Sequence, residues 1–267
     1  MRLRTFIAMF AIMTAAVPIA QAVDVVTWGT ATGITGDSDV STNGTLIYAY
    51  NLGATGVTST TVNGVTFDPW AIPQVGKTST LNQLSFTETG AGRLDSYNTL
   101  GTLTGAFSGL SSVYQALLST AGTTTNPNTI ELTLGGLTAG KSYEFQWWTN
   151  NSSLIRTTFG SEQLRNTTST AGNSLLLLSN PDGVQGGLGQ YVIGNFTASG
   201  TSQVISYNST APSRPMINAI QLRDITNVPE PSTYALAAIA SGVMAVVARR
   251  RKARQLDSNQ ETGGYRL

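Results

Sequence analysis

Short runs of strand-forming residues, each closed by turn residues, follow one another from Val23 to about Thr226. Asn63-Gly64 separates the runs Thr58–Val62 and Val65–Phe67, an arrangement typical of a tight β-hairpin. The run Thr129–Leu134 alternates apolar and polar side chains, which is the period of a half-buried strand. No regular alternation of strands with helices interrupts the series. The pattern therefore predicts an all-β fold.

The same reading predicts further strands at 24–28, 45–50, 81–87, 142–149, 156–159, 190–196, 202–207 and 216–223. One helix is expected at Leu110–Leu118, with Val113, Leu117 and Tyr114 on one side and Ser111 or Ser112 capping its start. Even strand spacing without a blade-like repeat favours a jelly roll. We therefore expect a single β-sandwich (jelly-roll) domain over residues 23–226, with one short helix.

Charge is scarce in this domain. Charged residues make up 11% of the chain, against about 25% in typical soluble domains. The segment Val23–Val228 carries seven basic and eleven acidic side chains, a net charge of −4. An acidic domain is a poor partner for nucleic acid, because phosphate neutralisation supplies most of that affinity. The chain contains no Cys and no His, so thiol nucleophiles, His-based triads and the usual zinc sites are excluded.

The first 22 residues have the layout of a signal peptide. Arg2 and Arg4 form a basic start, and an apolar stretch from Phe6 to Val17 follows. Ala20 and Ala22 form the A-x-A pattern of a cleavage site. We therefore expect residues 1–22 to be a signal helix for export, with a buried N-terminal helix as the alternative.

The segment behind the predicted domain combines a proline motif, an apolar stretch and a basic cluster. Pro229, Glu230 and Pro231 come first. The apolar stretch to Ala248 has about 18 residues, near the minimum for a membrane span. The basic cluster consists of Arg249, Arg250, Arg251, Lys252 and Arg254. Cations that directly follow a span stay cytoplasmic, so the sequence predicts a C-terminal transmembrane helix with the β domain outside.

This arrangement resembles the PEP-CTERM sorting domain, with residues 227–254 as the sorting signal. The resemblance implies that an exosortase, a membrane-embedded transpeptidase, recognises Pro229, Glu230 and Pro231. It also implies transient anchoring in the inner membrane of a Gram-negative bacterium that makes exopolysaccharide, followed by transfer to the cell surface or extracellular polymer. Residues 255–267 continue as a polar tail, whereas family members usually end soon after the arginines. A plain single-span anchor is the alternative.

The middle domain is similar to galactose-binding-like jelly rolls in two places. The run from Leu137 to Trp148 resembles their "LTPGxxYxxxxW" strand entry, and 196–205 with 217–222 resembles their last two strands. This resemblance implies the fold, and such modules often carry a structural calcium ion. Asp37 and Asp39 offer the oxygen ligands that calcium takes, with turn capping as the alternative. No other cofactor is expected.

Two further features bear on function. Trp147 and Trp148 must point to opposite faces of their strand, so Trp148 is expected on the outer face as a platform for a sugar ring. The alternative is that a loop such as 150–154 covers it. Glu131 and Glu144 fall on candidate neighbouring strands, as in the carboxylate pair of a glycosidase. Solvent-facing charge is the alternative, because each alternates with an apolar face.

These observations predict a non-enzymatic, exported protein of structural or adhesive type at the cell surface or in the extracellular matrix. The alternative is a carbohydrate-binding module that recognises exopolysaccharide through Trp148. A glycan-cleaving enzyme built on Glu131 and Glu144 is a third hypothesis.

Overall fold

The computed structural model describes residues 25–125, 128–153, 162–166, 174–209 and 214–226. The predicted signal helix at 1–22, the strand at 156–159, the transmembrane helix within 227–254 and the tail 255–267 lie outside these residues. In the described ranges, no helix has the length and apolar character needed to cross a membrane.

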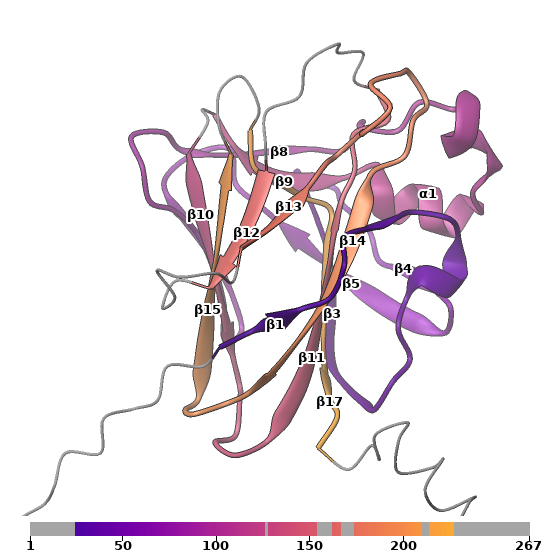
Figure 1. Cartoon of the computed structure of the whole chain (residues 1–267). Coiled ribbons are helices and arrows are strands. Elements are labelled where there is room, and N and C mark those ends of the chain that lie inside the picture. Colours follow the sequence, from indigo (N-terminus) through magenta and orange to yellow (C-terminus); the bar gives the residue numbers. More distant parts are fainter. Residues whose placement is uncertain (1–24, 126–127, 154–161, 167–173, 210–213, 227–267) are drawn as a thin grey trace, which may run out of the picture.

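Most described residues belong to two β-sheets that face one another (Figure 1). The first sheet has the strand order β1-β14-β11-β17-β3-β5-β4, with β2 beside β14. Its strands pair antiparallel except for β3 and β5, which run parallel. The strands are β1 (Thr27–Trp28), β2 (Thr32–Gly33), β3 (Thr45–Gly53), β4 (Thr60–Val62), β5 (Val65–Ala71), β11 (Ser142–Thr149), β14 (Gln190–Thr197) and β17 (Ala219–Asp224).

The second sheet has the order β13-β12-β15-β10-β7-β6, and a small third sheet has the order β16-β9-β8. The third sheet lies across one end of the sandwich (Figure 1). The strands of the second sheet are β6 (Thr78–Leu81), β7 (Leu84–Glu88), β10 (Thr129–Gly135), β12 (Glu162–Asn166), β13 (Ser174–Leu177) and β15 (Ser202–Ser209). Those of the third are β8 (Leu94–Tyr97), β9 (Ala121–Thr124) and β16 (Met216–Ile217).

The main core fills the space between the first and second sheets. Trp147 of β11 packs edge-on against Tyr207 of β15, with 4.8 Å between ring centroids. Leu132, Phe145 and Ile205 are fully buried in the same cluster. Alternation along β10 and β11 sends every second side chain into this layer, as the sequence pattern predicts. The expected all-β sandwich with one α-helix is thus observed.

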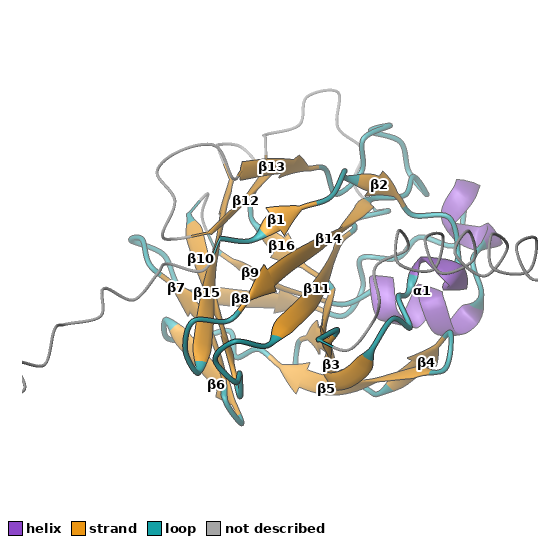
Figure 2. Cartoon of the chain, turned by 60° about the horizontal axis from the view of Figure 1, so that its bottom comes forward, coloured by secondary structure: helices purple, strands orange, loops and turns teal. Residues whose placement is uncertain are grey.

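A second core lies on the other face of the first sheet. Figure 2 shows the helix α1 (Ser112–Leu118) on the side of this sheet that faces away from the second sheet. Tyr114, Leu117 and Trp148 are fully buried there with Phe67 of β5. The first sheet is therefore buried on both faces, which the alternating sequence pattern does not indicate.

The helix begins two residues later than expected, at Ser112, and a different side of it is buried. Ser111 caps it by accepting a hydrogen bond from the Tyr114 backbone N–H at 3.2 Å. Tyr114, Leu117 and Leu118 face the second core, whereas Val113 is 39% exposed. The expected burial of Val113 is therefore wrong, because the buried face is made by Tyr114, Leu117 and Leu118 and leaves Val113 at its edge.

Two predicted strands are interrupted. The segment 81–87 contains a turn, and β6 and β7 form a hairpin around Asn82, whose φ is 53°. Asn is among the few residues that tolerate this left-handed conformation, so Asn82 was the missed turn signal. The segment 216–223 breaks at Asn218, whose Nδ2 donates to the carbonyls of Leu118, Thr120 and Asn150. Strand 142–149 has the bounds that were expected.

Candidate functional site

Trp148 does not present its ring to solvent. It is fully buried, its Nε1 donates to the Tyr114 hydroxyl at 2.9 Å, and its ring meets Phe67 edge-on at 5.6 Å. The covering groups come from α1 and β5, in addition to Tyr191 of β14. The expected exposure of Trp148 is therefore wrong, because the outer face of the first sheet carries a core of its own.

Glu131 and Glu144 do not form a pair. Glu144 lies on β11 in the first sheet and Glu131 on β10 in the second, so the expectation of neighbouring strands is wrong. Each alternates with side chains of the main core, so the two carboxylates point outward on opposite sides of the sandwich. Glu144 is 6% exposed and accepts hydrogen bonds from Ser41 Oγ and from Asn43 Nδ2, the latter at 3.2 Å.

Asp37 and Asp39 sit in a 3₁₀ turn beside the N-terminus of α1. Asp39 is 7% exposed and accepts from the backbone N–H groups of Thr35 (2.7 Å) and Gly36 (3.0 Å), and from the Tyr114 hydroxyl (3.1 Å). Asp37 accepts from Ser111 Oγ at 2.5 Å. Both carboxylates therefore already have protein donors, and among the described residues they do not belong to a group of three potential metal ligands. The calcium site stays a prediction.

A buried polar network covers part of the outer face of the first sheet. We call the segment Asp39–Gly44 the strap. Gln146 Nε2 donates to the Asp39 carbonyl at 2.6 Å, and Gln146 Oε1 accepts from the Ser41 N–H at 3.0 Å. Arg223 donates from Nη2 to the Gly44 carbonyl at 3.1 Å. Burial lowers the pKa of Arg223 from its usual value, and nearby Glu144 partly offsets this. The network holds the strap against β11 and β17.

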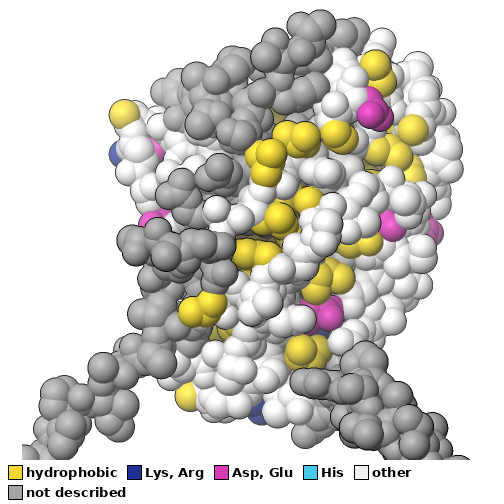
Figure 3. Space-filling model, viewed as in Figure 1, with side chains coloured by type: hydrophobic (Ala, Val, Ile, Leu, Met, Phe, Trp, Pro, Cys, Tyr) yellow, Lys and Arg dark blue, Asp and Glu magenta, His cyan; other side chains and the backbone are white. Residues whose placement is uncertain are grey.

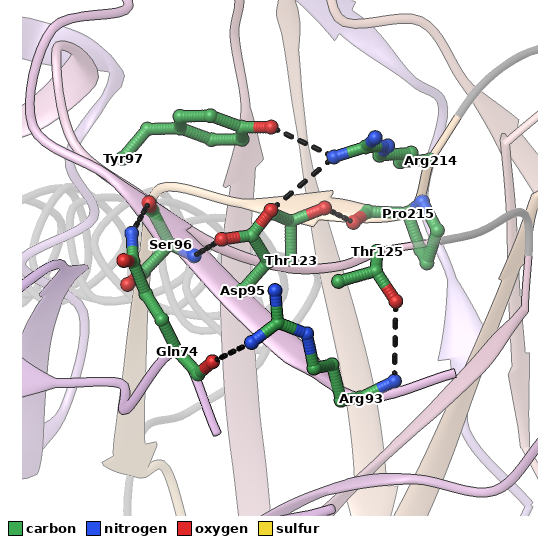
Figure 4. A network of polar contacts seen from close by, with 9 residues as sticks. All are labelled: Gln74, Arg93, Asp95, Ser96, Tyr97, Thr123, Thr125, Arg214 and Pro215. Atoms are coloured by element: carbon green, nitrogen blue, oxygen red, sulfur yellow. Dashed lines mark hydrogen bonds and ion pairs between the residues drawn. The ribbon is translucent and has the colours of Figure 1, made fainter. Parts of the chain in front are cut away.

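Another polar network joins the strands of the third sheet (Figure 4). Arg214 Nη1 donates to Asp95 Oδ2 at 3.2 Å and to the Tyr97 hydroxyl at 2.9 Å. Arg93 Nη1 donates to the carbonyl of Gln74, whose own Nε2 donates to the Ser96 carbonyl at 2.9 Å. Each arginine thus engages groups of the protein itself. This arrangement fixes β8 to its neighbours.

The surface is mostly uncharged. Figure 3 shows few charged side chains on the face that carries β1, β13 and β14, and apolar side chains are visible among white atoms of the backbone and of uncharged residues. Val25, just before β1, is 54% exposed, and Leu176 of β13 is 44% exposed. Single exposed apolar side chains are normal on soluble domains and do not by themselves mark a site.

A hollow of about 290 Å³ opens between the two large sheets. Tyr48 and Tyr50 of β3 line one side, Asn82 and Gln83 of the β6–β7 turn line another, and the Gly135-Gly136 backbone at the end of β10 completes it. The rings of Tyr48 and Tyr50 are 5.8 Å apart. Sequence reasoning missed this site, although Tyr48 and Tyr50 are two residues apart and therefore share a face of their strand.

Comparison with known families identifies the C-terminal segment. Residues 227–252 match the model of the PEP-CTERM protein-sorting motif. The match includes Pro229, Glu230 and Pro231 and the basic residues 249–252, and Arg254 follows just beyond it. The chain is therefore an exported β-sandwich protein. It carries a PEP-CTERM tag, which indicates handling by an exosortase-like membrane enzyme, transient anchoring at the C-terminus and a final location at the surface or outside the cell.

No curated protein matches the chain. Two solved structures show weak likeness. The extracellular domain of ANXUR1 from Arabidopsis thaliana aligns with a TM-score of 0.38 and 12% identity, over 66% of this chain and 41% of that one. A structure of carbohydrate-binding modules from the β-sandwich superfamily aligns with a TM-score of 0.15 and 12% identity, over 73% of this chain and 98% of that one. At these scores neither likeness bears on what this chain binds.

Proposed function

We propose that this chain is a structural or adhesive protein of the cell surface or extracellular matrix, and that its β domain acts without catalysis. The PEP-CTERM motif at 227–252 carries the proposal, because it is a protein-sorting motif. It begins just behind β17, which ends at Asp224, so the whole described domain precedes the tag and is sorted together with it. The face shown in Figure 3 carries few charged side chains, which suits a protein that works in a hydrated polymer.

The non-catalytic part of the proposal is supported by the positions of the acidic residues. Glu131 and Glu144 point outward on opposite sides of the sandwich, whereas a glycosidase needs two carboxylates across one cleft. Glu144 is moreover held by Ser41 and Asn43 of the strap.

We also propose that the sandwich is of the jelly-roll type. Its central pairings join segments far apart in the chain, as when β17 lies between β11 and β3, and β10 pairs with β15. Such long-range antiparallel pairing is typical of that architecture. The parallel pairing of β3 and β5 is a departure at one edge of the first sheet.

The test is to replace Pro229, Glu230 and Pro231 with alanine in the full chain, expressed in a bacterium that has an exosortase. We expect wild type at the surface or in the medium with the mass of the tag removed, and the variant retained unprocessed in the inner membrane. The matched control replaces Asp257, Ser258 and Asn259, which lie outside the matched motif. A triple-alanine variant that reaches the surface with the same mass as wild type would show that the motif does not sort this chain, and the surface role would lose the observation that carries it.

A further inference from the structure

We propose that the hollow beside Tyr48 and Tyr50 binds one neutral sugar unit of a glycan. This inference deepens the proposed surface function and rests on it. It assigns the glycan contact to residues of β3 and the β6–β7 turn, and not to Trp148, which is buried.

The hollow is a product of strand pairing. β5 pairs with β3 only from Tyr50 to Gly53. In the described part of the chain, the edge of β3 from Thr45 to Ala49 therefore has no strand beside it on that side. Ile47 of this unpaired stretch is 41% exposed and lines the hollow.

The aromatic wall of the hollow is rigid. The rings of Tyr48 and Tyr50 are inclined by 33°, and Tyr50 meets Trp70 edge-on with 5.9 Å between centroids. Trp70 in turn donates from Nε1 to Ser79 Oγ at 3.1 Å. Because these contacts fix the rings before any ligand arrives, little ordering free energy is lost on binding. The C–H faces of a pyranose ring are apolar and stack on such a surface.

The polar side of the hollow suits hydroxyl groups. Asn82 donates from Nδ2 to the Tyr50 hydroxyl at 3.0 Å, and the exposed Gln83 lies next to it. Amide side chains both donate and accept hydrogen bonds, as sugar hydroxyls do. Among the described residues that line the hollow, none carries a formal charge, and burial raises the pKa of the Tyr48 phenol further above neutral pH. The lining therefore favours a neutral polyhydroxy ligand over an acidic one.

Two glycines give the hollow its shape. Gly136 has a φ of 76°, a backbone conformation that favours glycine. A Cβ at Gly135 would collide with the Gln83 carbonyl oxygen. The absence of this carbon lets the β6–β7 turn come close to the end of β10. The resulting 290 Å³ lies near the lower end of ligand pockets, about 300–1,000 Å³, which suits one ring and not a long oligosaccharide.

The experiment uses the full chain in a detergent without a sugar headgroup, since a glucoside or maltoside would compete. Saturation-transfer NMR and calorimetry measure binding of maltotriose, cellotriose and mannotriose, with alginate as the acidic comparison. We expect saturable binding of at least one neutral trisaccharide, and at least about a tenfold loss in Asn82→Gly, because one polar contact of 1.4 kcal/mol corresponds to tenfold. A second variant of the hollow, Gln83→Ala, changes a side chain that is exposed.

Asn63→Gly is the matched control. Asn63 also occupies a left-handed turn position, with φ 49°, and also donates one side-chain hydrogen bond, to the Val40 carbonyl at 2.8 Å. The Asn63→Gly variant should bind the neutral trisaccharides as strongly as wild type does. Binding of alginate alone, of no saccharide, or with equal strength in wild type, Asn82→Gly and Gln83→Ala would each overturn the inference. Cell fractionation of Asn82→Gly separates this outcome from the proposed function, because sorting depends on the tag and should be unchanged.

Discussion

On one face of β11 lie Tyr143, Phe145 and Trp147, and on the other lie Glu144, Gln146 and Trp148. All six are nearly or fully buried. The first face is covered by the apolar side chains of the second sheet, and the second face partly by the strap, through hydrogen bonds to Gln146 and Glu144. The comparison teaches that the two faces of one strand can be equally buried while different forces hold their covers in place.

The largest expected effect is on the apolar face. Trp147→Ala removes a fully buried ring from the main core, where it packs against Tyr207. We expect a loss of about 3–5 kcal/mol in unfolding free energy, because the cavity cannot fully collapse. Urea denaturation measures it. A loss below about 1 kcal/mol would mean that the two sheets do not close on this residue.

The polar face is tested by one substitution made in two places. Glu144→Gln replaces an acceptor of the Ser41 and Asn43 hydrogen bonds with an amide, and should cost about 1.5–3 kcal/mol, the range for hydrogen bonds to charged groups. Glu131→Gln makes the same change on the outer face of the second sheet, where no strap is seen in the described chain, and should stay within about 0.5 kcal/mol. Equal losses would show that the hydrogen bonds from Ser41 and Asn43 to Glu144 give it no stability beyond that of an outward carboxylate on the second sheet.

A third, smaller effect concerns the ion pair of Lys141 and Asp224 at the end of the first sheet, where the Lys141 side chain is largely open to solvent. Lys141 Nζ lies 2.6 Å from Asp224 Oδ2, and this hydrogen bond, with those from Thr226, lowers the pKa of Asp224 from 3.8 to about 2. The stabilisation is present above pH 3.8 and is lost as the pH falls through about 2. Asp224→Asn should remove this pH dependence. The change should be under about 1 kcal/mol, since exposed ion pairs contribute little.

Denaturation of wild type and Asp224→Asn at pH 4 and pH 2 measures this effect, with added salt as the control because exposed pairs are screened. An identical loss of stability in both proteins would assign the acid sensitivity to other carboxylates.

The smallest expected effect is that of Val113→Ala on the exposed side of α1. Val113→Ala should change the unfolding free energy by less than about 0.5 kcal/mol, because Val113 is 39% exposed and alanine favours the helix. Leu117→Ala, on the buried side, should cost about 2–5 kcal/mol. If both variants lost similar amounts, the helix would be rotated toward the face that the sequence first suggested.

Much of the fold could be predicted because strand period and turn chemistry are local. Ser142–Thr149 and the Asn63-Gly64 hairpin are examples. The burial of Trp148 and Glu144 could not, because their covers come from 30 or more residues away in sequence, on α1 and the strap. The hollow beside Tyr48 and Tyr50 depends on which residues of β3 pair with β5, and no local sequence pattern encodes that. The sorting tag was readable because its signal is a contiguous motif.

The place of β17 in the first sheet has a consequence for the order of events during export. β17 is the final described strand in the chain, yet it lies between β11 and β3. The sheet cannot acquire its native centre until residues 219–224 have crossed the inner membrane, and the tag follows almost at once. The native strand order of the first sheet is therefore completed only by the segment that directly precedes the tag.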